Sequence, residues 1–362
     1  MSRRCLSLVL ALVVGLGLGA PGALAPLSVA GPVVAAEPPA SAALQATRIT
    51  IGLLGILPDA PYLLMRERGY LAEQGLDAEY QTFDSGARMV QPLAVGQLDM
   101  APGSPSVGLY NAVARGINVK IVADWASGAP TNPVNWIVVR RDLADSGAVR
   151  DYADLRGRRV AISARGTSTH VQLGRLAERG GFPLAELDLV EIGYPDMAAA
   201  LLGGSIDAAV MTEPGVALAE ERGIGVRWRS SDELVPGQVA AVVTYGPSFL
   251  EQRPEVGRRA MVAYLKAVRD YYNTFVVQDP ATRAAVIPLL MQVTPFKDRA
   301  LYDRVQMPSV NPDGFVNVDA LESDYRWFVS EGLLADVGGV RPLVDHQFVE
   351  YALQQVGPYR RP

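Results

Sequence analysis

The chain has 362 residues, of which 49% are hydrophobic and 20% are charged, and its formal net charge is −5. This is an ordinary globular composition, and the length is sufficient for two compact lobes. The acidic balance provides no electrostatic footprint for nucleic acid, so we expect no nucleic-acid partner.

The N-terminus has the layout of a cleaved secretory signal. A basic segment at residues 1–4 precedes an uncharged apolar run at 6–18, and small residues and prolines follow. The run is too short for a membrane span of about 20 residues, which favours cleavage over an uncleaved anchor. We assign residues 1–36 to the signal and 37–46 to a disordered leader, and we expect a periplasmic protein.

The residues available for chemistry are few. The single cysteine, Cys5, lies inside the predicted signal and precedes its apolar run, so it is not the lipid-bearing cysteine that follows such a run. A zinc site built on His170 and His346 would need unusual ligands. The sequence contains neither a P-loop nor a Gly-x-Ser-x-Gly elbow, and no carboxylate pair stands out by spacing. We therefore expect no catalysis, no metal and no cofactor.

Strands and helices alternate along the first two thirds of the chain, which predicts an α/β fold with mainly parallel sheets and flanking helices. Strands are expected over 48–54, 76–83, 98–101, 119–124, 136–140, 160–163, 187–192, 208–211 and 239–245, with helices over 62–68, 89–95, 171–179 and 197–202 between them. Helical spacing then dominates 254–275, 282–290, 320–332 and 344–356. This tail has too few strands for a third sheet, so we expect it to pack on the first lobe.

An internal repeat supports two similar lobes. Met89-x-x-x-Leu93-x-x-Gly96-x-Leu98-Asp99-x-Ala101 matches Met197-x-x-x-Leu201-x-x-Gly204-x-Ile206-Asp207-x-Ala209 at a constant offset of 108 (197 − 89 = 209 − 101 = 108). In both copies the Met and Leu should face a sheet, the Gly should end a helix in a left-handed conformation, and the Asp should occupy the turn before a strand.

Five segments together resemble the nitrate/sulfonate/taurine-type periplasmic binding proteins, whose domain type is shared with thiamine-pyrimidine biosynthesis proteins. They read ITIGLLGILPDAPYLLMRERGYLAEQGLDAEY, LAVGQLDMAPGSPSVGLYNAVARGINVKIVADW, YADLRGRRVAISARGTSTHVQLGRLAERGG, AALLGGSIDAAVMTEPG and NVDALESDYRWFVSEGLL. The biosynthetic enzymes carry a cysteine-rich motif that this chain lacks.

The resemblance implies a two-lobed periplasmic-binding-protein fold of type II with the ligand in a cleft between the lobes. The crossovers are then expected near Val138–Arg141 and Ala241–Tyr245. These positions assign 47–140 and 244–362 to lobe 1 and 141–243 to lobe 2. The implied partners are a small-molecule ligand and an ABC permease in the inner membrane, and the implied state is a monomer.

Ligands of open α/β sheets bind beyond the carboxyl ends of strands, where helix N-termini converge. This rule predicts thirteen ligand-binding residues: Asp59, Tyr62, Ser85, Arg88, Ser104, Ser106, Trp125, Arg165, Thr167, Ser168, Tyr194, Thr212 and Glu213. The serines and threonines either contact a ligand oxygen or cap helices. Arg88 and Arg165 either neutralise an acidic ligand or lie on the surface. Glu213 either accepts from an amino group or braces the hinge, and the aromatic rings offer stacking surfaces.

The leading hypothesis is an extracytoplasmic solute-binding protein that closes by a hinge motion and delivers its ligand to an ABC importer. The alternatives are an exported enzyme acting on a small heterocycle and a ligand-responsive partner of a membrane sensor. The ligand class stays open. The arginines and helix N-termini favour an anion such as a sulfonate or carboxylate, whereas Glu213, Asp59 and the aromatics favour a pyrimidine-like heterocycle.

Overall fold

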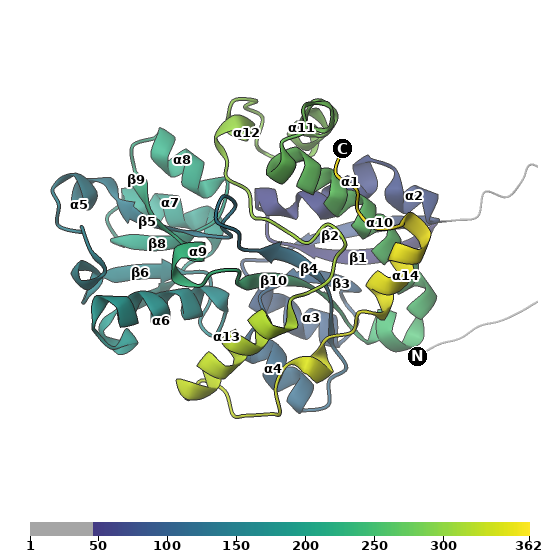
Figure 1. The fold of residues 1–362 in the computed structure, drawn as a ribbon, viewed down its shortest axis with the longest axis horizontal. Coiled ribbons are helices and arrows are strands. Elements are labelled where there is room, and N and C mark those ends of the chain that lie inside the picture. Colours follow the sequence, from purple (N-terminus) through teal and green to yellow (C-terminus); the bar gives the residue numbers. More distant parts are fainter. Residues whose placement is uncertain (1–45) are drawn as a thin grey trace, which may run out of the picture. The chain divides into compact units, whose positions relative to one another are not determined.

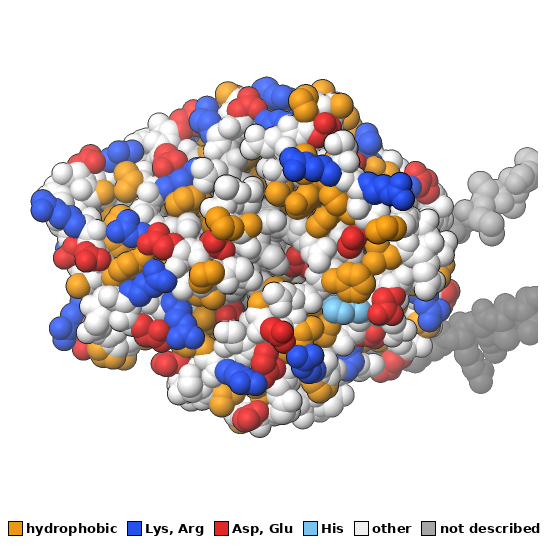
Figure 2. Space-filling view, viewed as in Figure 1, with side chains coloured by type: hydrophobic (Ala, Val, Ile, Leu, Met, Phe, Trp, Pro, Cys, Tyr) orange, Lys and Arg blue, Asp and Glu red, His pale blue; other side chains and the backbone are white. Residues whose placement is uncertain are grey.

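The computed structural model describes residues 46–362 (Figure 1). The predicted signal and nearly all of the predicted leader fall on residues 1–45 and lie outside the described residues. The described residues belong to one unit by their internal contacts. Within this part of the chain, no helix is both long and apolar enough to cross a membrane. Acidic and basic side chains are interspersed over the face shown in Figure 2.

The first sheet has five strands in the order β2-β1-β3-β10-β4. Its strands are β1 (Thr47–Leu53), β2 (Leu76–Thr82), β3 (Met100–Gly103), β4 (Lys120–Ser127) and β10 (Val239–Tyr245). Strand β1 pairs in parallel with β2 and β3, and β10 pairs antiparallel with β3 and β4.

The second sheet repeats this arrangement in the order β7-β6-β8-β5-β9. Its strands are β5 (Trp136–Arg140), β6 (Arg159–Ile162), β7 (Asp188–Glu191), β8 (Ala208–Met211) and β9 (Gly225–Ser230). Strand β6 pairs in parallel with β7 and β8, and β5 pairs antiparallel with β8 and β9.

Each sheet is mixed but mainly parallel, as expected, since four of its five strands run in the same direction. Only the strand that enters from the other lobe, β5 or β10, runs against its neighbours. One expectation needs correction: the crossovers lie earlier than expected, at residues 128–135 and 235–238, because β5 belongs to the second sheet and all of β10 to the first. The apolar strands before and after a crossover have the same sequence pattern, so the pattern does not reveal which sheet each strand joins.

Helices flank each sheet, as the alternation predicts. Those of the first lobe are α1 (Ala60–Glu67), α2 (Tyr70–Glu73), α3 (Val90–Ala94) and α4 (Val107–Ala114). Those of the second are α5 (Arg141–Asp145), α6 (Ser168–Gly180), α7 (Tyr194–Leu202), α8 (Gly215–Glu221) and α9 (Ser231–Leu234). The tail contributes α10 (Pro254–Tyr272), α11 (Pro280–Val293), α12 (Leu301–Arg304), α13 (Val318–Ser330) and α14 (Gln347–Val356).

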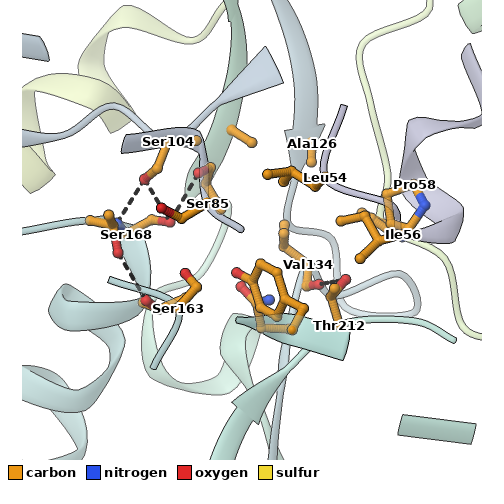
Figure 3. Close-up of a pocket in the computed structure, with 18 of the residues that line it drawn as sticks. Leu54, Ile56, Pro58, Ser85, Ser104, Ala126, Val134, Ser163, Ser168 and Thr212 are labelled. Atoms are coloured by element: carbon orange, nitrogen blue, oxygen red, sulfur yellow. Dashed lines mark hydrogen bonds between the residues drawn. The ribbon is translucent and has the colours of Figure 1, made fainter. Parts of the chain in front are cut away.

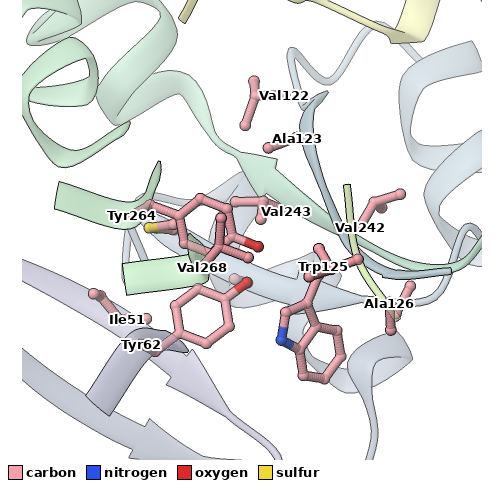
Figure 4. Packing of buried hydrophobic residues seen from close by; sticks show 14 of the residues in the cluster. Ile51, Tyr62, Val122, Ala123, Trp125, Ala126, Val242, Val243, Tyr264 and Val268 are labelled. Atoms are coloured by element: carbon pink, nitrogen blue, oxygen red, sulfur yellow. The ribbon is translucent and has the colours of Figure 1, made fainter. Parts of the chain in front are cut away.

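The tail completes the first lobe, as expected. One apolar cluster joins residues of β1 and β4 to Tyr264 of α10 and Phe348 of α14. In this cluster the centroid of the Tyr62 ring lies 6.0 Å from that of the Trp125 ring and 5.5 Å from that of the Tyr264 ring (Figure 4). The second lobe has separate clusters on the two faces of its sheet.

The internal repeat corresponds to one recurrent structural unit. Gly96 and Gly204 adopt positive φ angles of 74° and 66°. Asp99 accepts a hydrogen bond from the Thr50 N–H at 2.8 Å, and Asp207 accepts the equivalent bond from the Arg159 N–H at 3.1 Å. In each lobe the aspartate therefore ties the turn after a helix to the strand at the same place in its sheet, β1 or β6.

Candidate ligand-binding site

A cavity lies between the two sheets (Figure 3). Its lining comes from both lobes and from the first crossover. The lining residues are Leu54, Ile56, Pro58, Ser85, Gly86, Ser104, Trp125, Ala126, Val134, Asn135, Ser163, Thr167, Ser168, Thr169, Tyr194, Thr212, Ala240, Ala241 and Pro308.

The first lobe contributes an apolar and aromatic wall. The loop after β1 supplies Leu54, Ile56 and Pro58, and the buried Asp59 holds this loop in shape. Its Oδ2 accepts the N–H groups of Leu54 at 3.0 Å and Ile56 at 3.1 Å. The Trp125 indole donates to the Pro58 carbonyl at 3.1 Å, which fixes the ring against the same loop.

Hydroxyl groups from both lobes meet at one end of the cavity. The Ser168 N–H, in the first turn of α6, donates to the Ser104 Oγ at 2.9 Å, and the two hydroxyl oxygens lie 3.1 Å apart. The Ser168 hydroxyl donates to the Ala240 carbonyl of β10 at 2.9 Å. These bonds cross between the lobes and hold the α6 N-terminus against the first lobe.

The second lobe contributes a neutral polar wall. Thr212 donates to the Val134 carbonyl at 3.3 Å. Tyr194 begins α7, and burial raises the pKa of its phenol, while hydrogen bonding to Ser163 and Asn135 opposes that rise. The phenol therefore stays protonated at neutral pH, and this wall presents hydroxyl and amide groups without charge.

A buried amide network anchors Asn135 from behind. The Gln172 amide donates to Asn135 Oδ1 at 3.2 Å and to Gln238 Oε1 at 2.8 Å. The Gln238 amide in turn donates to Asp324 Oδ2 at 2.7 Å. The network thus links both crossovers to α6 and to α13 of the tail.

Seven of the thirteen predicted residues line this cavity: Ser85, Ser104, Trp125, Thr167, Ser168, Tyr194 and Thr212. Three others are buried beside it without facing it. Asp59 shapes the loop, Tyr62 packs in the core of the first lobe, and Ser106 caps α4 by accepting the Leu109 N–H at 3.3 Å.

The three charged candidates do not reach the cavity. The Arg88 side chain is 71% exposed and faces Asp84, and the Arg165 side chain is 53% exposed and faces Glu191. Glu213 is buried, but its carboxylate is bonded to Arg227. Consequently, no Asp, Glu, Lys, Arg or His of residues 46–362 lines the cavity.

The thirteen predicted residues leave out twelve that line the cavity: Leu54, Ile56, Pro58, Gly86, Ala126, Val134, Asn135, Ser163, Thr169, Ala240, Ala241 and Pro308. Most are apolar or small and resemble core residues in sequence. The strand-end rule does point to the loop of Leu54, Ile56 and Pro58, since it follows β1. Asn135 was missed because it lies in the crossover, which was expected elsewhere.

The described residues contain no group of three or more His, Cys, Asp or Glu side chains placed to hold a metal ion. The Trp125 and Tyr194 rings line the cavity together with several hydroxyl and amide groups.

Comparison with known proteins places this geometry in a family. The model of the NMT1-like family matches residues 42–291. The riboflavin-binding protein RibY of Chloroflexus aurantiacus is 25% identical over 67% of this chain and 66% of its own length. The taurine-binding periplasmic protein of Escherichia coli is 25% identical over 56% of this chain and 60% of its own length. The chain thus spans less than two thirds of either relative.

A solved structure has the same fold. The alkanesulfonate-binding protein SsuA from Xanthomonas axonopodis pv. citri, bound to MOPS, aligns with a TM-score of 0.67 at 20% identity. The alignment covers 83% of this chain and 98% of SsuA. The two-lobed periplasmic-binding-protein fold predicted from the sequence is therefore confirmed.

Proposed function

Because the chain belongs to the NMT1-like family, we propose that it is an extracytoplasmic solute-binding protein that captures a small, uncharged, flat heterocycle and delivers it to an ABC importer. The two lobes close on the ligand by a hinge motion, and the closed form docks as a monomer on a permease in the inner membrane. It acts without catalysis.

The uncharged lining of the cavity supports a neutral ligand. Enclosing an anion away from water costs several kcal/mol unless a cation or several donors compensate. The nearest predicted counter-charges, Arg88 and Arg165, point to surface carboxylates. The α6 N-terminus offers only partial positive charge, and the Ser168 N–H there already bonds to Ser104. A neutral ring needs only the apolar wall, the stacking surface and the hydroxyl edge that the cavity provides.

The two relatives bind ligands of both kinds: riboflavin, a neutral heterocycle, for RibY, and taurine, a sulfonate, for the taurine-binding protein. A thermal-shift screen distinguishes the two for this chain. We expect thymine, lumichrome or riboflavin to raise the Tm, and methanesulfonate and nitrate to leave it unchanged. Ligand at about 100 times its Kd adds about 2.7 kcal/mol to the free energy of unfolding. A larger shift with the anions would reject the proposed ligand class.

The competing enzyme hypothesis has its own test. The protein is incubated with the compound that shifts the Tm, and the mixture is followed by mass spectrometry. We expect one unchanged molecule per chain at every time point. Conversion of more molecules than there are chains would replace the transport role with an enzymatic one.

A further inference from the structure

A second space lies next to the cavity. We call it the outer chamber. It is lined by Gly55, Ile56, Tyr194, Pro195, Ala198, Thr212, Glu213, Pro214, Gly215, Leu218, Arg222, Pro295 and Phe296. Gly55, Ile56, Pro295 and Phe296 come from the first lobe and its tail, and the others come from the second lobe. Like the cavity, the outer chamber is therefore formed between the lobes.

The two spaces share a wall. Ile56, Tyr194 and Thr212 line both of them. Ile56 and Thr212 lie at the same side of the cavity in Figure 3. Tyr194 is only half-buried, and in the cavity its phenol interacts with Ser163 and Asn135. A ligand in the cavity therefore needs to pass only these three residues to extend into the outer chamber.

The outer chamber differs from the cavity in its chemistry. Ala198, Pro214, Leu218 and Phe296 give it a mainly apolar lining, and its two charged residues are Glu213 and the exposed Arg222. The Glu213 carboxylate has little remaining capacity to accept a hydrogen bond from a ligand, because Arg227 and two backbone N–H groups already donate to its oxygens.

Leu218 of α8 is the most informative lining residue. It is half-buried, and it belongs neither to the buried apolar clusters of the described chain nor to the side chains packed against them. Its side chain therefore presents apolar surface to the outer chamber rather than to either core.

We propose that the outer chamber holds an apolar substituent of the same ligand whose uncharged ring occupies the cavity. This inference rests on the proposed function. It assigns the ligand to a narrower class, that of a polar heterocycle carrying an apolar group. Closure of the lobes then buries both parts in one step, which couples recognition of the substituent to recognition of the ring.

Cysteine protection provides the test, because the only native cysteine is Cys5. In the full chain carrying Cys5→Ser, Leu218→Cys places a thiol in the outer chamber. Leu202→Cys is the matched control, since Leu202 is 72% exposed on α7 and lies outside both spaces. The probes are thymine and 5-benzyluracil, which share a ring and differ in one apolar group. Iodoacetamide measures how accessible each thiol is.

We expect 5-benzyluracil to bind about tenfold more tightly than thymine, since burying its phenyl group contributes about 1.4 kcal/mol or more. At ten times its Kd it should slow alkylation at position 218 about tenfold. Thymine should leave that rate within about twofold, and neither probe should slow alkylation at position 202. If Leu218→Cys lowers the Tm, Ala198→Cys replaces it.

Failure of this inference can be distinguished from failure of the proposed function. If both uracils bind and neither protects position 218, the outer chamber is not part of the ligand site, while the proposed function stands. Tighter binding of 5-benzyluracil without protection leads to the same rejection. If no neutral ring shifts the Tm in the screen above, the proposed ligand class fails and this inference fails with it.

Discussion

The Glu213 carboxylate accepts a hydrogen bond from the Arg227 guanidinium at 2.7 Å, and its same oxygen accepts the Gln306 N–H at 3.0 Å. Its other oxygen accepts the Ala217 N–H at 3.1 Å. Gln306 belongs to the tail of the first lobe, whereas Glu213 follows β8 of the second. Burial raises the pKa of Glu213, and Arg227 and the two N–H groups oppose that rise. The sequence left two roles open for Glu213, a brace of the hinge and a contact with the ligand. This arrangement favours the brace.

Glu213→Gln should therefore destabilise the ligand-free protein. The change removes a charge-assisted hydrogen bond and leaves Arg227 with Glu220 as its remaining carboxylate partner, at 3.2 Å. We expect the free energy of unfolding to fall by about 1.5–3 kcal/mol, while affinity stays within about threefold. Urea denaturation and calorimetric titration measure the two quantities.

Glu221→Gln is the control for this change, because Glu221 forms an exposed ion pair with Arg304. Such pairs contribute about 0–1 kcal/mol. An unchanged free energy of unfolding together with a tenfold or larger loss of affinity in Glu213→Gln would place Glu213 in the ligand site instead.

The exposed arginines provide a second prediction, about the charge of the ligand. Arg88→Ala and Arg165→Ala should each leave affinity within about twofold, because both side chains lie outside the cavity. Ser104→Ala, in contrast, removes the acceptor of the Ser168 N–H. A neutral hydrogen bond contributes about 1 kcal/mol, so affinity should fall about fivefold. A larger loss in either arginine variant than in Ser104→Ala would indicate an anionic ligand.

Much of the fold could be predicted from the sequence because it depends on local rules. Met89 and Met197 are both buried, and Gly96 and Gly204 both adopt positive φ, as the repeat predicts. Strand β9 was missed because Arg227 and Arg229 interrupt its apolar residues. It lies at the edge of its sheet, where one side is unpaired and polar residues are tolerated.

The site was less predictable because side-chain direction depends on distant neighbours. Arg88 and Arg165 precede helices at the cavity, but Asp84 and Glu191 attract them outward. Asp59 follows the correct strand, but its carboxylate is used by backbone N–H groups of its own loop. The strand-end rule identifies the loops that meet a ligand. It does not identify which residues in them face the cavity.

A third prediction concerns pH and the buried Asp324 of α13. Burial raises its pKa to about 7, against the hydrogen bond from Gln238 and the charge of Arg175. Between about pH 4 and 7 the folded protein thus holds a proton that the unfolded chain releases. This contribution to stability is fully present below the unfolded pKa and is lost as the pH rises through 7.

Asp324→Asn should remove this contribution. Each such proton changes the free energy of unfolding by about 1.4 kcal/mol per pH unit, so the decline between pH 5 and pH 7 should be shallower in the variant. Burial also raises the pKa values of Asp59 and Asp124 to about 7, so these two residues still contribute to the pH dependence of the free energy of unfolding in the variant. Urea denaturation at pH 5, 6, 7 and 8 provides the measurement. Parallel curves for the two proteins would show that Asp324 is ionised throughout.

The last prediction concerns the contact between α6 and α13, which lie side by side (Figure 1). Helix α6 belongs to the second lobe, and Trp327 of α13 packs in the core of the first. A Cβ atom at Gly174 would lie 2.1 Å from the Trp327 ring, closer than any real contact. The indole also meets His170 of α6 edge-on, with ring centroids 5.6 Å apart. Gly174 therefore permits the lobes to approach at this point.

Gly174→Ala should oppose closure without unfolding either lobe. Overpacking at such a contact costs about 1–3 kcal/mol, and here the helices can separate by opening the cleft. We expect affinity to fall about fivefold to a hundredfold, while the ligand-free Tm stays equal or rises, because alanine favours a helix over glycine by about 1 kcal/mol. Gly203→Ala is the control, since Gly203 has a φ of −74° and its Cβ would meet only a carbonyl at 3.4 Å. Calorimetric titration gives the affinities, and small-angle scattering with saturating ligand reports closure. If Gly174→Ala binds as tightly as the unmodified protein, the α6–α13 contact does not control closure and the cleft closes around another point.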